Sequence, residues 1–222
     1  MLIPANAGDY ILLPDLLSLH MLRSNASSTI ISYHAGAEHR VTTAEALHRR
    51  LNVAGRSVYW NNIFASNEDP TFVFLILLWY ALYGWDEALE ALYSHICWLV
   101  RKYSHVVECM FSTAKQESRV IHTNDINLTQ ELHVMQAHLL HYTSLLEDFR
   151  KTVVFVSDTP NPALDDPAQY SPEARLRSQE LMRRECERLL SEIARLEKSR
   201  AMQSKRLRNV MKLVRAISFL PS

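Results

Sequence analysis

The chain has 222 residues, of which 48% are hydrophobic and 22% are charged, and its 24 lysines and arginines balance 24 aspartates and glutamates. This length and composition suffice for one folded domain with a hydrophobic core, and they argue against an intrinsically disordered chain. The four glycines are too scattered to form a glycine-rich phosphate loop. They also leave few tight turns, so the composition argues against a many-stranded barrel and predicts a helical protein.

Cysteine spacing and the first residues bear on the compartment of the protein. Cys97, Cys109 and Cys186 lie far apart without a CxxC pair, which argues against a zinc ribbon or a disulfide framework and is typical of a reducing cytosol. The start of the chain lacks the basic and then apolar pattern of a secretory signal. The longest apolar run, residues 72–85, would rise about 21 Å as a helix, short of the roughly 30 Å of a bilayer core. We therefore expect a soluble, cytoplasmic chain without a membrane span.

Charge is distributed unevenly along the chain. Residues 173–215 contain 13 lysines and arginines but 6 acids, and no acid follows Glu197. The sequence therefore predicts an acidic body with a basic C-terminal arm, which could bind phosphate backbones, nucleic acid or an anionic bilayer. Because the bases alternate with apolar positions, a solvated, positively charged helix face is the interpretation that we prefer.

The first third of the chain predicts a small α/β unit. Residues 29–34 (TIISYH) and 57–64 (SVYWNNIF) are short β-branched or aromatic runs that favour strands. Thr42 or Thr43 is a suitable N-cap for a short helix with Glu45 in its first turn. So few strands need a covering element to be stable, and the next segment provides one.

Asp69 and Pro70 predict the start of a helix, because an acidic cap precedes proline at its first turn. The helix is predicted over residues 71–99. Its first half is apolar on all sides, as expected of a buried core helix. Its second half is amphipathic, with one apolar face formed by Ala88, Leu92, Ile96 and Leu99.

Two heptad seams follow, and each predicts a long helix that buries one stripe against another helix. The first seam comprises Leu128, Leu132, Met135, Leu139, Tyr142, Leu146, Phe149, Val153 and Val156. The second comprises Met182, Cys186, Leu189, Ile193 and Leu196, passes through polar Arg200 and Gln203, and resumes at Leu207, Val210 and Val214. Four prolines between the seams predict a loop at 157–172, so the two helices should form an antiparallel hairpin.

These patterns together predict an α+β protein that is predominantly α-helical. The small α/β unit and its apolar core helix occupy residues 1–99. Residues 100–116 form an insert, which either extends the core helix past Leu99 or makes an exposed loop, and which we expect to be poorly ordered. Residues 117–222 form the long helical hairpin with its basic C-terminal arm.

The sequence predicts no catalytic centre. His138 and His141 share a helix face and could bridge a metal, but His133 points elsewhere, so surface or interhelical histidines are the preferred interpretation. The adjacent acids Glu147 and Asp148 also point in different directions. No serine lies in a GxSxG elbow, so we expect no enzymatic activity, no catalytic residue and no cofactor-binding residue.

Three segments carry a resemblance to a known family. They are DPTFVFLILLWYALYGWDEALEALYSHICWL (69–99), ESRVIHTNDINLTQELHVMQAHLLHYTSLLEDFRKTV (117–153) and ECERLLSEIARLEKSRAMQSKRLRNVMKLV (185–214). In their order and amino-acid sequence they resemble the cytosolic part of CorA-like magnesium transporters of the divergent fungal branch. The resemblance implies an N-terminal α/β domain, long helices, and a stalk helix that leads into two membrane spans.

The resemblance further implies a pentamer at the cytosolic face of a membrane, in which Mg²⁺ bound between protomers controls opening of an ion path. The family's pore carries a Gly-Met-Asn signature, which this sequence lacks. We therefore expect a truncated regulatory fragment of a divalent-cation transporter, unable to transport alone, without a nucleic-acid partner and with membrane contact only through absent spans. No local motif assigns the family's metal ligands to residues here.

Two stretches suggest why the chain is short. The insert 100–116 and the tail 214–222 both begin with Val-Arg, which GTA-AGA would encode, and this matches a splice-donor consensus. We therefore interpret both as translated introns. The alternative function is a helical, coiled-coil-type interaction protein, which binds a partner helix or an anionic surface through its seam and arm.

Overall fold

The computed structural model describes residues 17–23, 28–34, 43–112, 118–166 and 170–218. These residues divide into two compact units. The first unit combines the described residues up to 83 with 150–192, and the second combines 84–149 with the residues from 193 onward. Three long helices contribute to both units: α3 (Phe72–Ser112), α4 (Ser118–Asp158) and α5 (Pro172–Ser218). The prediction of a predominantly helical α+β protein is confirmed.

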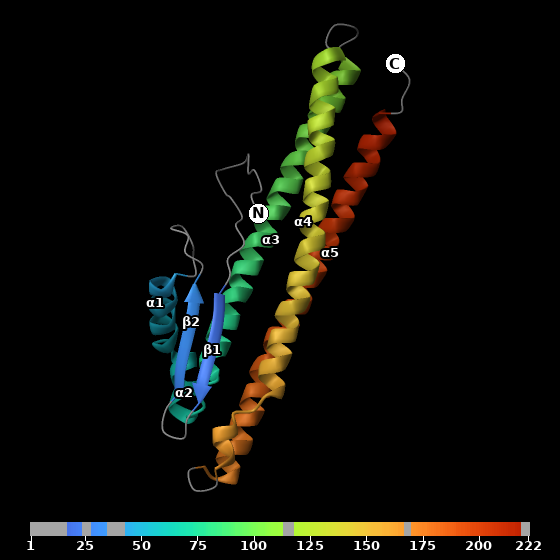
Figure 1. Cartoon of the computed structure of the whole chain (residues 1–222). Helices are drawn as coiled ribbons and strands as arrows, with labels where there is room; N and C mark the ends of the chain where they lie inside the picture. Colours follow the sequence, from blue (N-terminus) through green and yellow to red (C-terminus); the bar gives the residue numbers. More distant parts are fainter. Residues whose placement is uncertain (1–16, 24–27, 35–42, 113–117, 167–169, 219–222) are drawn as a thin grey trace. The chain divides into compact units, whose positions relative to one another are not determined.

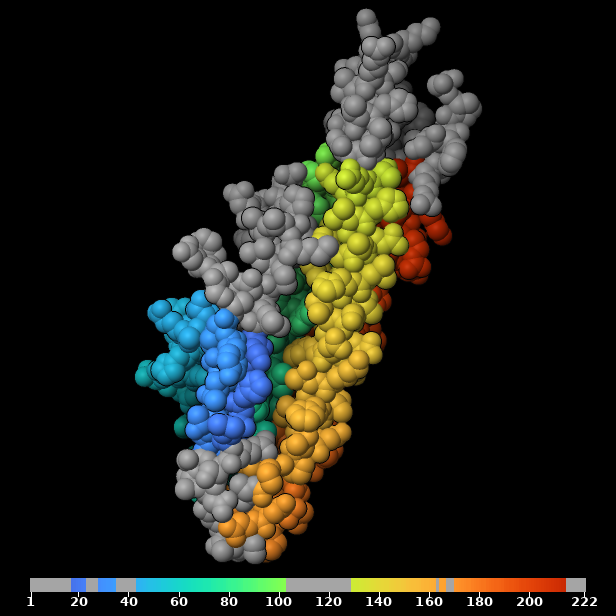
Figure 2. Space-filling model, viewed as in Figure 1, coloured from blue at the N-terminus to red at the C-terminus, as the bar shows by residue number. Residues whose placement is uncertain are grey.

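The first unit begins with an antiparallel pair of strands, β1 (Leu17–Arg23) and β2 (Ser28–His34). Side chains alternate between a half-buried face and an exposed one, as a strand that is covered on one side requires. On the exposed face the ring of His20 meets that of Tyr33 edge-on, with centroids 5.6 Å apart. Figure 2 shows both strands, in blue, at the surface. The strand predicted at 29–34 is confirmed, whereas β1 was not predicted.

Two short helices follow, α1 (Ala44–Gly55) and α2 (Val58–Ser66). Thr43 caps α1 as predicted, since its Oγ1 accepts a hydrogen bond from the Ala46 amide at 3.2 Å. The strand predicted at 57–64 is wrong, because this segment is α2. Its N-cap is Ser57, whose Oγ accepts from the Trp60 amide at 3.3 Å. Helical spacing stacks the Trp60 ring on Phe64, four residues later, with centroids 6.2 Å apart.

Helix α3 begins at Phe72, three residues after the cap that the sequence predicts. Asp69 accepts hydrogen bonds from the Thr71 amide at its carboxylate and from the Phe72 amide at its carbonyl. The first half of the helix supplies much of the core of the first unit, with Phe72 and Leu75 fully buried. The predicted core helix is therefore present.

Helix α3 is longer than predicted and continues through part of the insert to Ser112. The helical alternative for residues 100–116 thus holds as far as Ser112, and residues 113–117 lie outside the described part of the chain. Low order of the insert stays a prediction. Residues 72–102 form a helix that is long and apolar enough to cross a membrane by length and composition, although the run 72–85 alone is too short. The core helix of a soluble protein passes the same test, and about a third of the most apolar stretch is buried inside the protein.

In the second unit, stretches of α3, α4 and α5 form a three-helix bundle (Figure 1). Asp86 and Tyr93 of α3 contact Arg195 and Arg206 of α5, so these helices run parallel. Trp85 of α3 meets Tyr142 of α4 edge-on at 5.6 Å. His95 follows Trp85 in α3 and lies near Glu131, which precedes Tyr142 in α4. Helix α4 therefore runs antiparallel to the other two.

The two heptad seams are confirmed by burial. Apart from Leu128, whose side chain is outside the described residues, Tyr142 and Phe149 are half-buried and the other members of the first seam are buried. All apolar members of the second seam are buried, and so is Gln203, while Arg200 is half-buried. The predicted hairpin of α4 and α5 is therefore present in both units. Its loop contains a short 3-10 helix, η1 (Pro162–Asp165).

Candidate functional site

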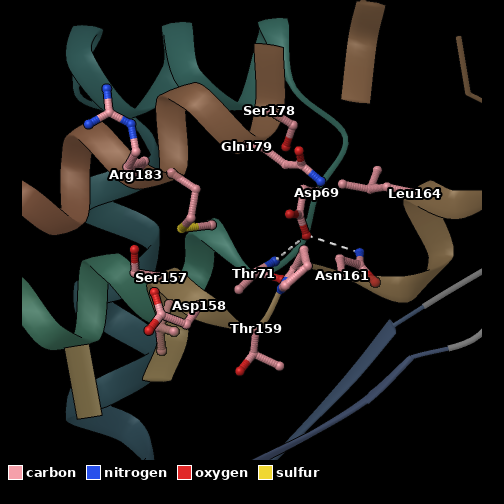
Figure 3. Close-up of a pocket in the computed structure, with 13 residues that line it drawn as sticks. Asp69, Thr71, Ser157, Asp158, Thr159, Asn161, Leu164, Ser178, Gln179 and Arg183 are labelled. Atoms are coloured by element: carbon pink, nitrogen blue, oxygen red, sulfur yellow. Dashed lines mark hydrogen bonds between the residues drawn. The ribbon is translucent and has the colours of Figure 1, made fainter. Parts of the chain in front are cut away.

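The first unit contains a pocket of about 310 Å³ beside the end of α4 (Figure 3). The residues just before α3, the end of α4 with the loop that follows it, and the second and third turns of α5 form its wall. Val156, Leu164 and Met182 make an apolar, buried floor. The polar lining residues are Asp69, Thr71, Ser157, Asp158, Thr159, Asn161, Ser178, Gln179 and Arg183. This volume is at the small end of the range for ligand sites.

A buried carboxylate holds the wall of this pocket together. The side chain of Asp69 accepts hydrogen bonds at the same oxygen from the Thr71 amide and from Asn161 Nδ2, each at 3.0 Å, while its other oxygen faces the pocket (Figure 3). Asn67 extends the network, because its Oδ1 accepts from the Asp69 amide and from the Ser178 hydroxyl. The network joins the start of α3 to the loop after α4 and to α5.

Charged and hydroxyl side chains both line the pocket. Arg183 bonds Glu180 and Glu187, and its hydrogen bond to Glu180 lowers the pKa of that exposed carboxyl. Ser157, Thr159 and Ser178 supply hydroxyls, but no histidine, cysteine or lysine is among the described residues that line the pocket. With the carboxylates of Asp69 and Asp158 beside them, these hydroxyls make a polar lining that can hydrogen-bond a small ligand.

In the first unit, α5 also presents a buried acid to α2. Glu185 has a fully buried side chain that accepts hydrogen bonds from Tyr59 and, at 3.0 Å, from Arg188. Burial, followed by the bond to Glu185, raises the pKa of Tyr59. The next residue, Cys186, lies in the seam, and burial raises the pKa of its thiol to about 11. Such a thiol is protonated and unreactive at neutral pH.

The three histidines considered as metal ligands do not converge. His133 and His141 are exposed, whereas His138 is buried in the second unit and stacks on Tyr142, with ring centroids 6.4 Å apart. Glu147 and Asp148 are both exposed. Over the described residues no group of three or more histidine, cysteine, aspartate or glutamate side chains could hold a metal ion.

A polar layer interrupts the apolar interior of the second unit. From the sequence, only Arg200 and Gln203 were identified as polar members of this interior. Gln203 donates from Nε2 to the Leu89 carbonyl at 2.9 Å, and Arg200 donates to the Thr143 hydroxyl at 2.6 Å. Neither ring nitrogen of His138 nor Oε1 of Gln203 has a hydrogen-bond partner among the described residues. The burial of His138 could have been predicted from its spacing, three residues after Met135 and four before Tyr142 of the seam.

The chain matches no protein-family model at a significant level, and it matches neither a curated protein nor a solved structure at that level.

Proposed function

We propose that this chain is the cytosolic, regulatory portion of a CorA-like divalent-cation transporter. One observation carries the proposal. The three segments that resemble this family (69–99, 117–153 and 185–214) coincide with three successive long helices, α3, α4 and α5, that follow a small α/β element. Such an order of elements is what the resemblance implies.

The mechanism proposed for this portion is a change in helix packing. Within the described part of the chain, the polar layer around Gln203 and His138 leaves buried groups without hydrogen-bond partners, so bundle packing in the second unit is not at its most stable. Helices that are held less tightly can shift against one another at modest cost, which is a common basis of switching.

Magnesium binding to this portion is proposed only with ligands that come from more than one copy of the chain. Mg²⁺ prefers oxygen ligands and retains several waters, but over the described residues of one chain no suitable group of side chains exists. We therefore derive no step through the ion. The resemblance implies that Mg²⁺ binds between protomers, so sensing in the manner of the family would use ligands from more than one copy of the chain.

The gene tests the proposal most directly. Genomic and transcript sequence beyond residue 222 should encode, in a frame that splicing can join, two apolar spans of about 20 residues each and a Gly-Met-Asn. Finding neither in any such frame would contradict the proposal and favour the helical interaction protein.

A biochemical measurement complements the gene. Hydrogen exchange of the 222-residue chain, followed with and without Mg²⁺, should show increased protection in α3, α4 and α5 at concentrations where the chain self-associates. Exchange that is identical in Mg²⁺ and in an equal ionic strength of K⁺ would count against a regulatory role.

A further inference from the structure

One face of α5 in the second unit carries cations and no acids. Between residues 198 and 214 all exposed charged side chains are basic, and they are Lys198, Lys205, Arg206, Arg208 and Lys212. The opposite face of the same stretch is the buried seam of Leu207, Val210 and Val214. The sequence predicted a basic arm, and the structure adds that its charges gather on one outward side.

The three lysines of this face form a row. Lys198, Lys205 and Lys212 are seven residues apart, so successive members differ by about 20° around the helix and by about 10 Å along it. A row of this kind presents its charges to a flat surface rather than to a single small anion.

The charges of this row are not neutralised within the described part of the chain. Lys198, Lys205, Arg208 and Lys212 make no ion pair there, whereas Arg195, one turn earlier, pairs with Asp86 at 3.1 Å. Arg206 lies over the ring of Tyr93 at 5.0 Å and keeps its charge at the surface. The face therefore attracts an anionic partner.

Two exposed apolar side chains indicate which kind of anionic partner this face binds. Met202 and Leu213 are each 59% exposed and lie on the same side of the helix as the lysines. Exposed apolar residues among lysines are typical of helices that rest in the headgroup region of an anionic bilayer. A partner helix would need an unbroken apolar seam, which Arg206 and Asn209 interrupt between these two residues.

We propose that the α5 face formed by residues 198–213 docks on an anionic lipid bilayer. The lysine ammonium groups contact lipid phosphates and carboxylates, and Met202 and Leu213 enter the boundary with the acyl chains. The sequence left a solvated face, phosphate backbones and an anionic bilayer open for the basic arm, and the exposed positions of Met202 and Leu213 favour the bilayer. The proposed docking depends on this face only, and it does not require the transporter function proposed above.

Vesicle co-sedimentation of the 222-residue chain tests the proposal. The chain should bind vesicles of phosphatidylcholine with about 30% phosphatidylserine at low salt, and should bind pure phosphatidylcholine much less. The triple variant Lys198→Gln, Lys205→Gln, Lys212→Gln should bind about 100-fold more weakly, at about fivefold for each lysine. Met202→Ser with Leu213→Ser should weaken binding by about tenfold.

A matched variant separates this face from net charge. Arg49→Gln, Arg56→Gln, Arg177→Gln removes three exposed bases of the first unit and should leave vesicle binding nearly unchanged. Equal losses in the two triple variants would overturn the proposal, and so would equal binding to neutral and anionic vesicles. Tighter binding of the wild-type chain to a short RNA duplex than to anionic vesicles would assign the face to nucleic acid instead.

Discussion

The side chain of Asp69 is only 5% exposed in the first unit. The stability of this unit therefore depends on the groups that donate hydrogen bonds to the Asp69 carboxyl. Asn161 supplies one of them from a loop 92 residues further along the chain. Asn161→Ala removes this donor and leaves a buried carboxyl oxygen with one hydrogen bond fewer, so the free energy of unfolding should fall by about 2 kcal/mol. Urea unfolding followed by far-ultraviolet circular dichroism measures the change.

The control for this variant is Asn52→Ala, in which an exposed asparagine of α1 is replaced. Its effect should stay within about 0.5 kcal/mol. If Asn161→Ala lowers stability no more than Asn52→Ala does, the bond between Asn161 and Asp69 does not hold the wall of the pocket.

His138 should make stability depend on pH. Burial lowers the pKa of its imidazole in the folded state. Above the unfolded value, about 6.5, both states are neutral and stability is insensitive to this group. Below it the unfolded chain takes up a proton that the folded chain resists, so the free energy of unfolding should fall as pH falls, by at most about 1.4 kcal/mol per unit. The fall continues down to the folded pKa.

Substitution separates His138 from other groups. Urea midpoints measured between about pH 7.5 and 5.5 should fall less steeply in His138→Gln than in the wild type. The exposed His133 is the control, and His133→Gln should keep the wild-type slope. Part of the slope should persist in His138→Gln, because burial also lowers the pKa of His95, an effect that Glu131 opposes. A slope that His138→Gln leaves intact would assign the dependence elsewhere.

At the scale of elements, the sequence predicted the long helices well and the short elements poorly. A seam of spacing four and three is repeated over many turns, so one misplaced residue such as Gln203 does not obscure it. The nine residues of α2 contain Tyr59, Trp60 and Phe64, whose strand preference outweighed the weak capping signal of Ser57. Strand β1 was missed although Leu17, Leu19 and Met21 alternate with polar Ser18 and His20, and its pairing with β2 is a contact that no local pattern specifies.

The candidate pocket was not predicted, because it is formed by residues that lie far apart in the sequence. Asp69 was identified as a helix cap, and the proline-rich stretch as a loop, but the bond between Asp69 and Asn161 joins residues with no common local pattern. Such a contact follows from how α3, α4 and α5 pack, which heptad spacing does not specify. The basic face was predictable in composition, and the row of its lysines follows from their spacing of seven residues.

The interruption of the seam of α5 at Gln203 has a cost that can be measured. Oε1 of this buried side chain has no partner among the described residues, and the helical carbonyl of Leu89 that it contacts does not depend on it. Gln203→Met keeps the length of the side chain and removes the unpaired group, so the free energy of unfolding should rise by about 1 kcal/mol. The control Gln130→Met alters an exposed residue of α4 and should change it by less than about 0.5 kcal/mol.

The outcome of this substitution bears on the proposed switch. A stabilised bundle that also loses any Mg²⁺-dependent change in hydrogen exchange would link the polar layer to regulation. A destabilised Gln203→Met variant would mean that the bond to Leu89 outweighs the unpaired oxygen, and the polar layer would then hold the bundle together.

At the scale of the whole molecule, the insert 100–116 can be tested by its removal. In the second unit, His95 of α3 lies near Glu131 of α4, so the chain reverses direction between them. Deleting residues 100–116 leaves 18 residues between these two positions. That is enough for two turns of helix on each side and a short connection, since helix–helix connections in bundles commonly take about two to eight residues.

If the insert is a translated intron, the chain without it should fold at least as well as the full chain. The core residues Leu99 and Leu132 lie outside the deleted segment, and its described side chains, Val100, Arg101 and Lys102, are exposed. The urea midpoint of the shortened chain should therefore equal or exceed that of the full chain, and circular dichroism should show a helical protein. As a control, deleting 17 residues from the seam of α4, residues 132–148, should abolish cooperative unfolding, because it removes Leu132, Met135, Leu139 and Leu146. A shortened chain that loses cooperative unfolding in the same way would show that residues 100–116 belong to the fold, and the intron hypothesis would then fail.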